Sequence, residues 1–148
     1  MKRIMLMILA GSIIMACGED EPTIETIDSS MPQGTFTSSK SGTFVEQNDT
    51  GSAGLAELGT DEDGTQFLHF GSNFMTNLGT GTVTVYLSTS DTYMADPGNG
   101  NPDLLLIAGV KNNGEQYFKL QPAAASKFTH VILWCGSANI PFGYAQLQ

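Results

Sequence analysis

The stretch Phe128–Leu147 reads FTHVILWCGSANIPFGYAQL, and it decides which fold this chain can adopt. Its first half is apolar at consecutive positions, so both faces of a strand there are apolar, as in the middle of a packed sheet. Turn-forming residues follow, and a second apolar run closes the stretch. We therefore predict two strands, Phe128–Cys135 and Gly143–Leu147, joined by a turn at Gly136–Pro141.

Short β-prone segments precede this pair along most of the chain. Val83, Val85 and Leu87, for example, alternate with polar or aromatic neighbours, which is typical of a half-buried strand. Glycine, Asn, Asp and Pro separate the segments. The other predicted strands are Thr35–Thr37, Thr43–Glu46, Ala53–Leu58, Gln66–Phe70, Val83–Leu87, Leu104–Ala108 and Gln116–Leu120. The pattern predicts an all-β fold, an antiparallel β-sandwich or partly open barrel of about eight to nine short strands.

The composition agrees with one folded domain. The chain has 148 residues, of which 41% are hydrophobic and 14% are charged. About 100 to 150 residues suffice for a single core, and a disordered chain would carry fewer apolar residues. We expect the domain to span residues 34–148.

The N-terminus has the pattern of an export signal. Lys2 and Arg3 precede an apolar run from Ile4 to Met15, which is too short to cross a bilayer. Ile14-Met15-Ala16-Cys17 resembles the lipobox of bacterial lipoproteins, whose cysteine is lipidated after cleavage. We therefore expect a signal peptide at residues 1–16 and a membrane anchor at Cys17.

An acidic segment follows the predicted lipidation site. Residues 17–33 are rich in Glu, Asp, Ser, Thr and Pro, which is typical of a flexible tether. The alternative is that Ile24 or Ile27 begins an edge strand. The first acidic residues resemble the surface-export signal of lipoproteins in some Gram-negative lineages. We expect an outer-membrane lipoprotein of the Gram-negative cell envelope, exposed at its surface.

The charge of the predicted mature chain argues against nucleic acid as a partner. The full chain has a net charge of −9, and removal of Lys2 and Arg3 with the signal leaves 15 acidic and 4 basic residues, a net charge of −11. Such a chain repels phosphate backbones.

Cys135 is the main candidate for chemistry. With Cys17 lipidated, it has no disulfide partner within the chain. Three interpretations remain open: an inert buried thiol, a thiolate that binds a metal or prosthetic group, and an exposed redox thiol. Trp134, the single tryptophan of the chain, is its neighbour.

The two histidines are weak metal candidates. His69 and His130 both lie in predicted strands, where a lone histidine needs a second ligand to bind a metal. His130 and Cys135 are an odd number of residues apart, so a regular strand points them to opposite faces. A cupredoxin-like site would need a His and a Met shortly after Cys135, and Gly136–Gln148 contains neither. No C-x-x-C-H motif for covalent haem is present. Catalytic signatures are missing too, so the residues favour a domain other than a catalyst.

The segment from about Gly34 to Leu147 resembles the electron-transfer DM-thirteen domain, a small extracellular β module. The blocks that carry the resemblance are Leu68-His69-Phe70 with Asn73-Phe74, Val85-Tyr86-Leu87, Gly114-Glu115-Gln116-Tyr117, Val131-Ile132-Leu133-Trp134-Cys135 and Phe142-Gly143-Tyr144-Ala145-Gln146-Leu147. The last two blocks together are the most specific part of it.

The resemblance implies a β-sandwich-like fold and a redox role for Cys135, as a bare thiol or as a haem ligand. The chain departs from the family pattern in two places. Gly81-Thr82-Val83-Thr84 stands where the family has Gly-Pro-Asp-Leu, and Ala138 stands where it has an aromatic residue. We expect a lipid-anchored extracytoplasmic domain with an electron-transfer role centred on Cys135 and an unknown redox partner. The alternative is a non-catalytic binding or structural module of the cell envelope.

Overall fold

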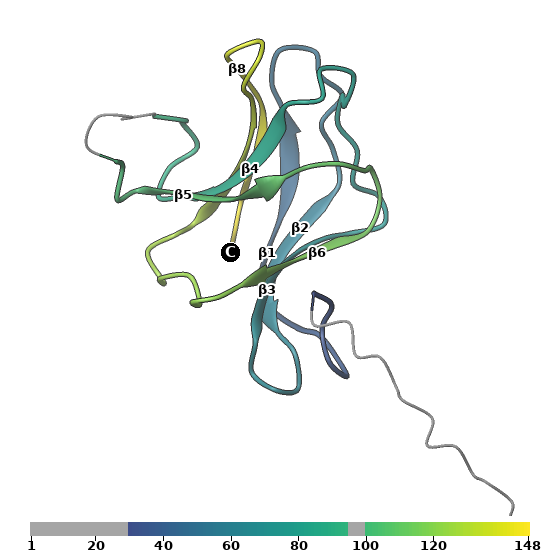
Figure 1. The fold of residues 1–148 in the computed structure, drawn as a ribbon, viewed down its shortest axis with the longest axis vertical. Coiled ribbons are helices and arrows are strands. Elements are labelled where there is room, and N and C mark those ends of the chain that lie inside the picture. The colour runs from purple at the N-terminus through teal and green to yellow at the C-terminus, as the bar shows by residue number, and fades with distance from the viewer. Residues whose placement is uncertain (1–29, 95–99) are drawn as a thin grey trace, which may run out of the picture.

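The structure, a computed structural model, describes residues 30–94 and 100–148 and contains eight strands. Their bounds are β1 Thr37–Glu46, β2 Leu55–Thr60, β3 Gln66–Phe70, β4 Val83–Ser88, β5 Leu104–Gly109, β6 Gln116–Leu120, β7 His130–Cys135 and β8 Ile140–Gln146 (Figure 1). No helix occurs in the described residues, so none there is long and apolar enough to cross a membrane. The predicted all-β class is confirmed.

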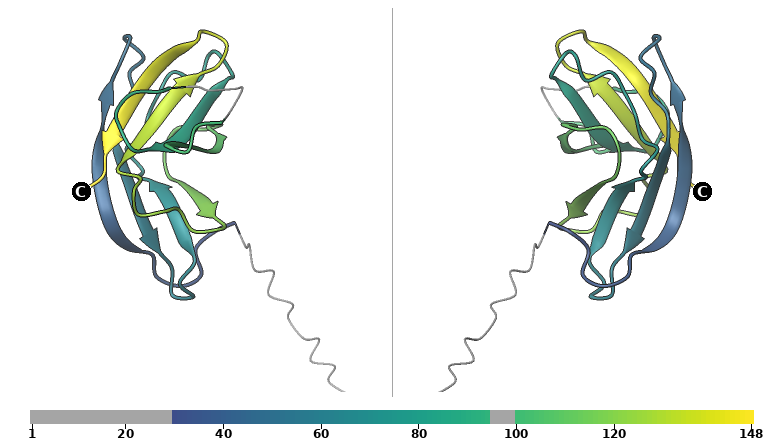
Figure 2. Two further views of the ribbon diagram at one scale, coloured as in Figure 1. Left: turned by 90° about the vertical axis from the view of Figure 1, so that its left-hand side faces the viewer. Right: turned by 90° about the vertical axis from the view of Figure 1, so that its right-hand side faces the viewer.

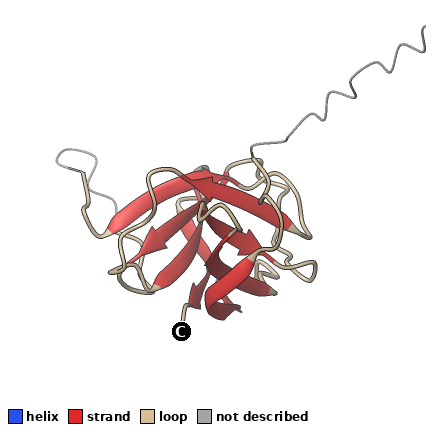
Figure 3. Ribbon diagram, turned by 90° about the horizontal axis from the view of Figure 1, so that it is seen from below, coloured by secondary structure: helices blue, strands red, loops and turns tan. Residues whose placement is uncertain are grey.

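The strands form one antiparallel sheet that curls into a nearly closed barrel. Their order is β5-β4-β7-β8-β1-β2-β3-β6, and the curvature is clear from the side and from below (Figures 2 and 3). β1 pairs with β2 through Thr37–Thr43 and with β8 through Phe44–Glu46. The two edge strands, β5 and β6, contact each other without pairing. Of the two predicted architectures, the partly open barrel describes this sheet better.

Gly42 marks the point on β1 where the C-terminal end of the chain comes closest. A Cβ atom at Gly42 would lie 2.1 Å from the carbonyl oxygen of Gln146. Ser41 and Gln148 exchange two backbone hydrogen bonds beside it, of 2.9 and 3.0 Å. A side chain at this position would separate β1 from the end of β8, so glycine is needed here.

The largest departures from the predicted strand bounds lie in β1 and β8. Thr35–Thr37 and Thr43–Glu46 were expected as separate strands, whereas β1 is continuous across the polar residues between them. This polar part of β1 is a strand because it pairs with β2, with a bulge between Ser38 and Lys40. Neither the pairing nor the bulge can be recognised from an apolar pattern in the sequence. The predicted turn also ends earlier than expected, because Ile140 and Pro141 belong to β8. A register shift between Leu133 and Trp134 lets Pro141 pair there.

The predicted lipobox and most of the predicted tether lie outside the described residues. Gln33, at the end of the predicted tether, contacts the β2–β3 hairpin: its N–H donates to Oδ2 of Asp61 at 3.0 Å. The N–H of Thr35 likewise donates to Oε1 of Glu62 at 2.9 Å. The backbone donor of Gln33 outweighs the effect of burial and lowers the pKa of Asp61. The carboxylates of Asp61 and Glu62 therefore attach the first residues of the domain to the β2–β3 hairpin.

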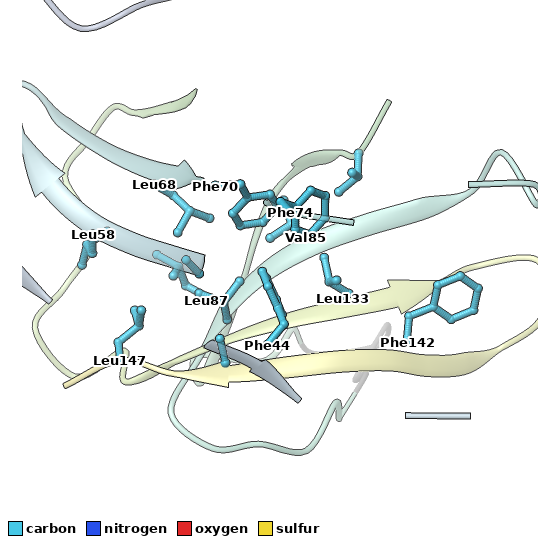
Figure 4. Packing of buried hydrophobic residues seen from close by; sticks show 14 of the residues in the cluster. Phe44, Leu58, Leu68, Phe70, Phe74, Val85, Leu87, Leu133, Phe142 and Leu147 are labelled. Atoms are coloured by element: carbon cyan, nitrogen blue, oxygen red, sulfur yellow. The ribbon is translucent and has the colours of Figure 1, made fainter. Parts of the chain in front are cut away.

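One hydrophobic core fills the barrel. Phe44, Phe70 and Phe74 contact one another with ring centroids 4.4 to 5.4 Å apart, and aliphatic side chains of β2, β4, β7 and β8 surround them (Figure 4). Burial of each such aromatic ring stabilises the fold by about 2–3 kcal/mol. Cys135 belongs to this cluster.

Candidate functional site

Cys135 is the last residue of β7 and lies between two neighbouring strands. It pairs with Val83 of β4 and with Ile140 of β8. Its side chain shares the inner face of β7 with Val131 and Leu133 and is 0% exposed. The thiol is free of any disulfide. The sulfur therefore sits where the core meets the end of the barrel.

Hydroxyl groups surround the sulfur on the side away from the core. Sγ lies 3.5 Å from Oγ1 of Thr82 and 3.6 Å from Oγ of Ser137. The N–H of Ser137 donates to Oγ1 of Thr82 at 3.0 Å, and the Thr82 hydroxyl donates back to Oγ of Ser137 at 2.7 Å. The hydroxyls of Thr82 and Ser137 therefore both lie within hydrogen-bonding reach of the sulfur.

These donors change the acidity of the thiol. Burial by itself raises the pKa of Cys135, but hydrogen bonds from the hydroxyls of Thr80, Thr82 and Ser137 and from the backbone of Ala138 oppose it. Together they lower the pKa to about 6 from the ordinary value of 9.0. These donors therefore favour the thiolate of Cys135, the form that acts as a nucleophile.

Only one turn separates the thiolate from solvent. Residues 136–139, which join β7 to β8, are all exposed. The N–H of Asn139 donates to the Cys135 carbonyl at 2.9 Å, and Asn139 has φ 55°, a left-handed conformation that asparagine tolerates. Through Ser137, this exposed turn lies directly against the sulfur.

Trp134 lies on the opposite face of β7 from Cys135. Its ring stacks on Tyr93 with centroids 3.9 Å apart and an interplanar angle of 14°. Tyr93 in turn contacts Tyr86 edge to face at 5.2 Å. Burial, with a hydrogen bond to Tyr86, raises the pKa of Tyr93 to about 12. Trp134 is thus an immediate chain neighbour of Cys135 but not a contact of its thiol.

His130 also lies on the outer side of β7, away from Cys135. Its Nδ1 is 2.9 Å from the hydroxyl of Thr129, and its ring faces Tyr144. The register between β4 and β7 is regular over these residues, so strand parity separates the two side chains. The structure does not bring His130 and Cys135 together.

His69 lies elsewhere, on β3, between two carboxylates. Its Nδ1 is 2.9 Å from Oε2 of Glu57 and its Nε2 is 3.1 Å from Oε1 of Glu115, while its ring stacks on Tyr117 at 4.3 Å. Each carboxylate contacts a different nitrogen of the ring, and the two nitrogens point in different directions. The three side chains therefore do not surround one common point where a metal ion could bind. In the described parts of the chain, no group of three or more such side chains is placed to hold a metal ion.

The sequence alone did not identify Thr80, Thr82 and Ser137 as neighbours of the thiol. Thr82 and Cys135 are 53 residues apart and meet only because β4 pairs with β7. The position of Ser137 two residues after Cys135 is the one local signal that could have identified it.

Comparison with protein families identifies one family model that matches most of the chain. The family described as Electron transfer DM13 matches residues 43–147, which include Cys135 and all of β2–β8. The chain belongs to this family. Comparisons with curated proteins and with solved structures gave no match. Membership in the Electron transfer DM13 family supports a redox or electron-transfer role for the domain.

Both departures from the expected DM13 pattern lie beside the sulfur. Thr82 supplies a hydroxyl at 3.5 Å, and the backbone of Ala138 donates to the thiolate. Neither contact depends on an aromatic side chain at position 138.

A haem ligand role for Cys135 does not fit this arrangement. The residue is 0% exposed, with core residues on one side and hydroxyls on the other. The best-defined cavities of the described residues have volumes of about 230, 150 and 270 Å³, and neither Cys135, Thr82 nor Ser137 lines any of them. Cys135 is therefore not placed to ligate haem in this structure.

Proposed function

We propose that this protein passes electrons by thiol–disulfide exchange at Cys135, as a domain held to a membrane by a lipid at Cys17. The observation that carries the proposal is the ring of donors on a thiol whose pKa is lowered to about 6. Membership in the Electron transfer DM13 family supports it.

The exchange begins with the thiolate. Cys135 attacks one sulfur of a partner's disulfide; the new S–S bond forms as the old one breaks, and the released sulfur takes a proton from water. A donor thiolate next attacks the Cys135 sulfur and releases the second partner sulfur. A second donor thiolate then attacks the donor sulfur and frees Cys135 as a thiolate. Two donor thiols lose two electrons in this sequence, and the acceptor disulfide gains them.

The second thiol has to come from outside the chain. The sequence has two cysteines, and Cys17 is the predicted lipid site. Cys135 therefore acts without a resolving cysteine of its own, and its redox partner is a protein or small molecule that brings thiols.

The proposal requires that a disulfide can reach the Cys135 sulfur in the folded protein. The full chain carrying Cys17→Ala, purified in neutral detergent, should react under native conditions with one equivalent of an aromatic disulfide that releases a coloured thiolate. The rate should rise with pH around 6, the pKa of Cys135, and Cys135→Ser should remove the reaction. Reaction only after denaturation would contradict the proposal.

The second candidate is a non-catalytic binding or structural module. The complete burial of Cys135 within the core favours it. In that case the thiol reacts with the aromatic disulfide only in denaturant. Cys135→Ala then lowers the free energy of unfolding and has no effect on any redox reaction of the protein. The same labelling experiment separates the two candidates.

The location is proposed on the sequence pattern alone. We propose that the chain is an outer-membrane lipoprotein of a Gram-negative cell envelope, displayed at the surface, with an acidic tether between lipid and domain. Growth with a labelled fatty acid should label the wild-type protein and leave Cys17→Ala unlabelled. Loss of surface accessibility to a protease after neutralisation of the acidic residues that follow Cys17 would support display, and unchanged accessibility would contradict the proposed signal.

A further inference from the structure

We propose that a cavity on the outer face of the β7–β8 hairpin binds an organic ammonium or guanidinium group. This site is separate from the thiol, because it lies beyond the sheet on the face that carries Trp134. It goes beyond the proposed redox function and does not depend on it.

The cavity has a volume of about 270 Å³, the size of a small organic group. Three separate parts of the chain build it: the residue after β1, the segment after β4, and the β7–β8 hairpin. Its lining residues are Gln47, Asp91, Thr92, Tyr93, Trp134 and Pro141.

The walls are aromatic and already in place. Tyr93 and Trp134 are stacked at 3.9 Å, so they form one rigid surface, and Pro141 pairs with Trp134 across the hairpin. A cation placed over the face of Trp or Tyr is attracted by the π electrons of the ring. A preformed aromatic wall therefore favours a cationic ligand and loses little entropy when the ligand binds.

The side-chain oxygens of the cavity are acceptors. Asp91 carries a carboxylate, and the Thr92 hydroxyl donates its proton to Oδ1 of Asp91 at 3.0 Å. A ligand that brings N–H donors can pair with the Asp91 carboxylate.

Charge selects against other ligands. None of the six lining residues is basic, so the cavity has no positive charge to attract an anion. The chain as a whole has a net charge of −9, which attracts cations to its surface. The lining therefore points to a protonated amine or a guanidinium, either a free small molecule or a Lys or Arg side chain of a partner protein.

The only tryptophan of the chain lies in this wall, so its fluorescence reports directly on the cavity. The full chain in neutral detergent is titrated with n-butylamine, which is protonated at neutral pH, and with n-butanol, its neutral counterpart, at constant ionic strength. The amine should shift the Trp134 emission with saturation, and n-butanol should not. An equal response to both compounds, or none to the amine, would overturn the proposal.

Matched variants locate the binding. Asp91→Asn should weaken amine binding about tenfold, because it removes the negative charge that attracts the ammonium group. Asp63→Asn makes the same charge change in the exposed β2–β3 turn and should leave the affinity unchanged. Circular dichroism verifies that each variant folds. Equal affinities for Asp91→Asn and Asp63→Asn would show only a general charge effect and would overturn the site.

A second comparison separates the two sources of the cation. A short lysine-containing peptide and the same peptide with its lysine acetylated are titrated in the same way. Tighter binding of the lysine peptide than of n-butylamine, lost on acetylation, supports a protein partner. Binding of n-butylamine at least as tight as that of the peptide supports a small-molecule ligand.

Discussion

The sulfur of Cys135 lies 3.6 Å from the hydroxyl oxygen of Ser137, two residues further along the same hairpin. Cys135 is wholly buried, whereas Ser137 is exposed, so this contact joins the hydrophobic core to the surface turn. Thr82, from the segment before β4, hydrogen bonds to Ser137 and fixes its orientation. The acidity of the thiol thus depends on the exposed turn that carries Ser137.

The Cys135 thiol should titrate with a midpoint near pH 6 in the folded protein. Ser137→Ala and Thr82→Val should each raise the midpoint by on the order of one pH unit, since each removes a hydrogen bond to a charged sulfur. Ultraviolet absorbance of the thiolate against pH measures this, with Cys135→Ser as the blank. A midpoint near 9.0 in wild type would contradict the assigned role of these hydroxyls.

Stability should depend on pH through the same group. The folded pKa of Cys135, about 6, lies below the ordinary value of 9.0. Between these two pH values the folded state therefore binds fewer protons than the unfolded state. The contribution to the free energy of unfolding is therefore complete above pH 9 and is lost as pH falls through 6. Urea unfolding of wild type and Cys135→Ser across this range measures it. The difference between the two proteins should grow with pH, and a constant difference would count against a buried thiolate.

Gly42→Ala should destabilise the barrel by about 1–3 kcal/mol, because the new methyl group would overlap the carbonyl of Gln146 and push β8 from β1. Gly109→Ala is the matched control, since the nearest atom to a Cβ there is the Val83 oxygen at 4.0 Å. Its effect should stay within about 0.5 kcal/mol. Equal losses in the two variants would mean that the close approach at Gly42 is not what requires glycine.

His69→Leu should lower the free energy of unfolding by about 1–3 kcal/mol, because it leaves the carboxylate of Glu57, whose side chain is 19% exposed, without its partner. Lys127→Met breaks an ion pair in which both side chains are largely exposed, so its cost should be close to zero. A cycle with Glu57→Gln isolates the coupling between Glu57 and His69. No coupling in that cycle would show that the contact is not stabilising.

Much of the fold was predictable because strand alternation is a local signal. The bounds predicted for Gln66–Phe70 and Gln116–Leu120 match β3 and β6. β1 was the exception, since its polar half is a strand only through pairing with β2. The early start of β8 was also missed, because a register shift accommodates Pro141 within a paired strand.

The candidate site was predictable only in part. Cys135 and its separation from His130 followed from the sequence, since neighbouring positions in a strand point to opposite faces. Nothing local linked Tyr93 to Trp134 or Gln47 to Pro141, because these contacts join segments far apart in the chain.

The sequence by itself determined an all-β domain with a cysteine at the end of an apolar strand, because burial patterns and residue positions are properties of the chain. Only the tertiary structure decided the chemistry available to that thiol. Strand pairing brings Thr82, 53 residues away, to 3.5 Å from the sulfur. The energy of a hydrogen bond depends on distance and direction in space, and neither is set by position along the chain.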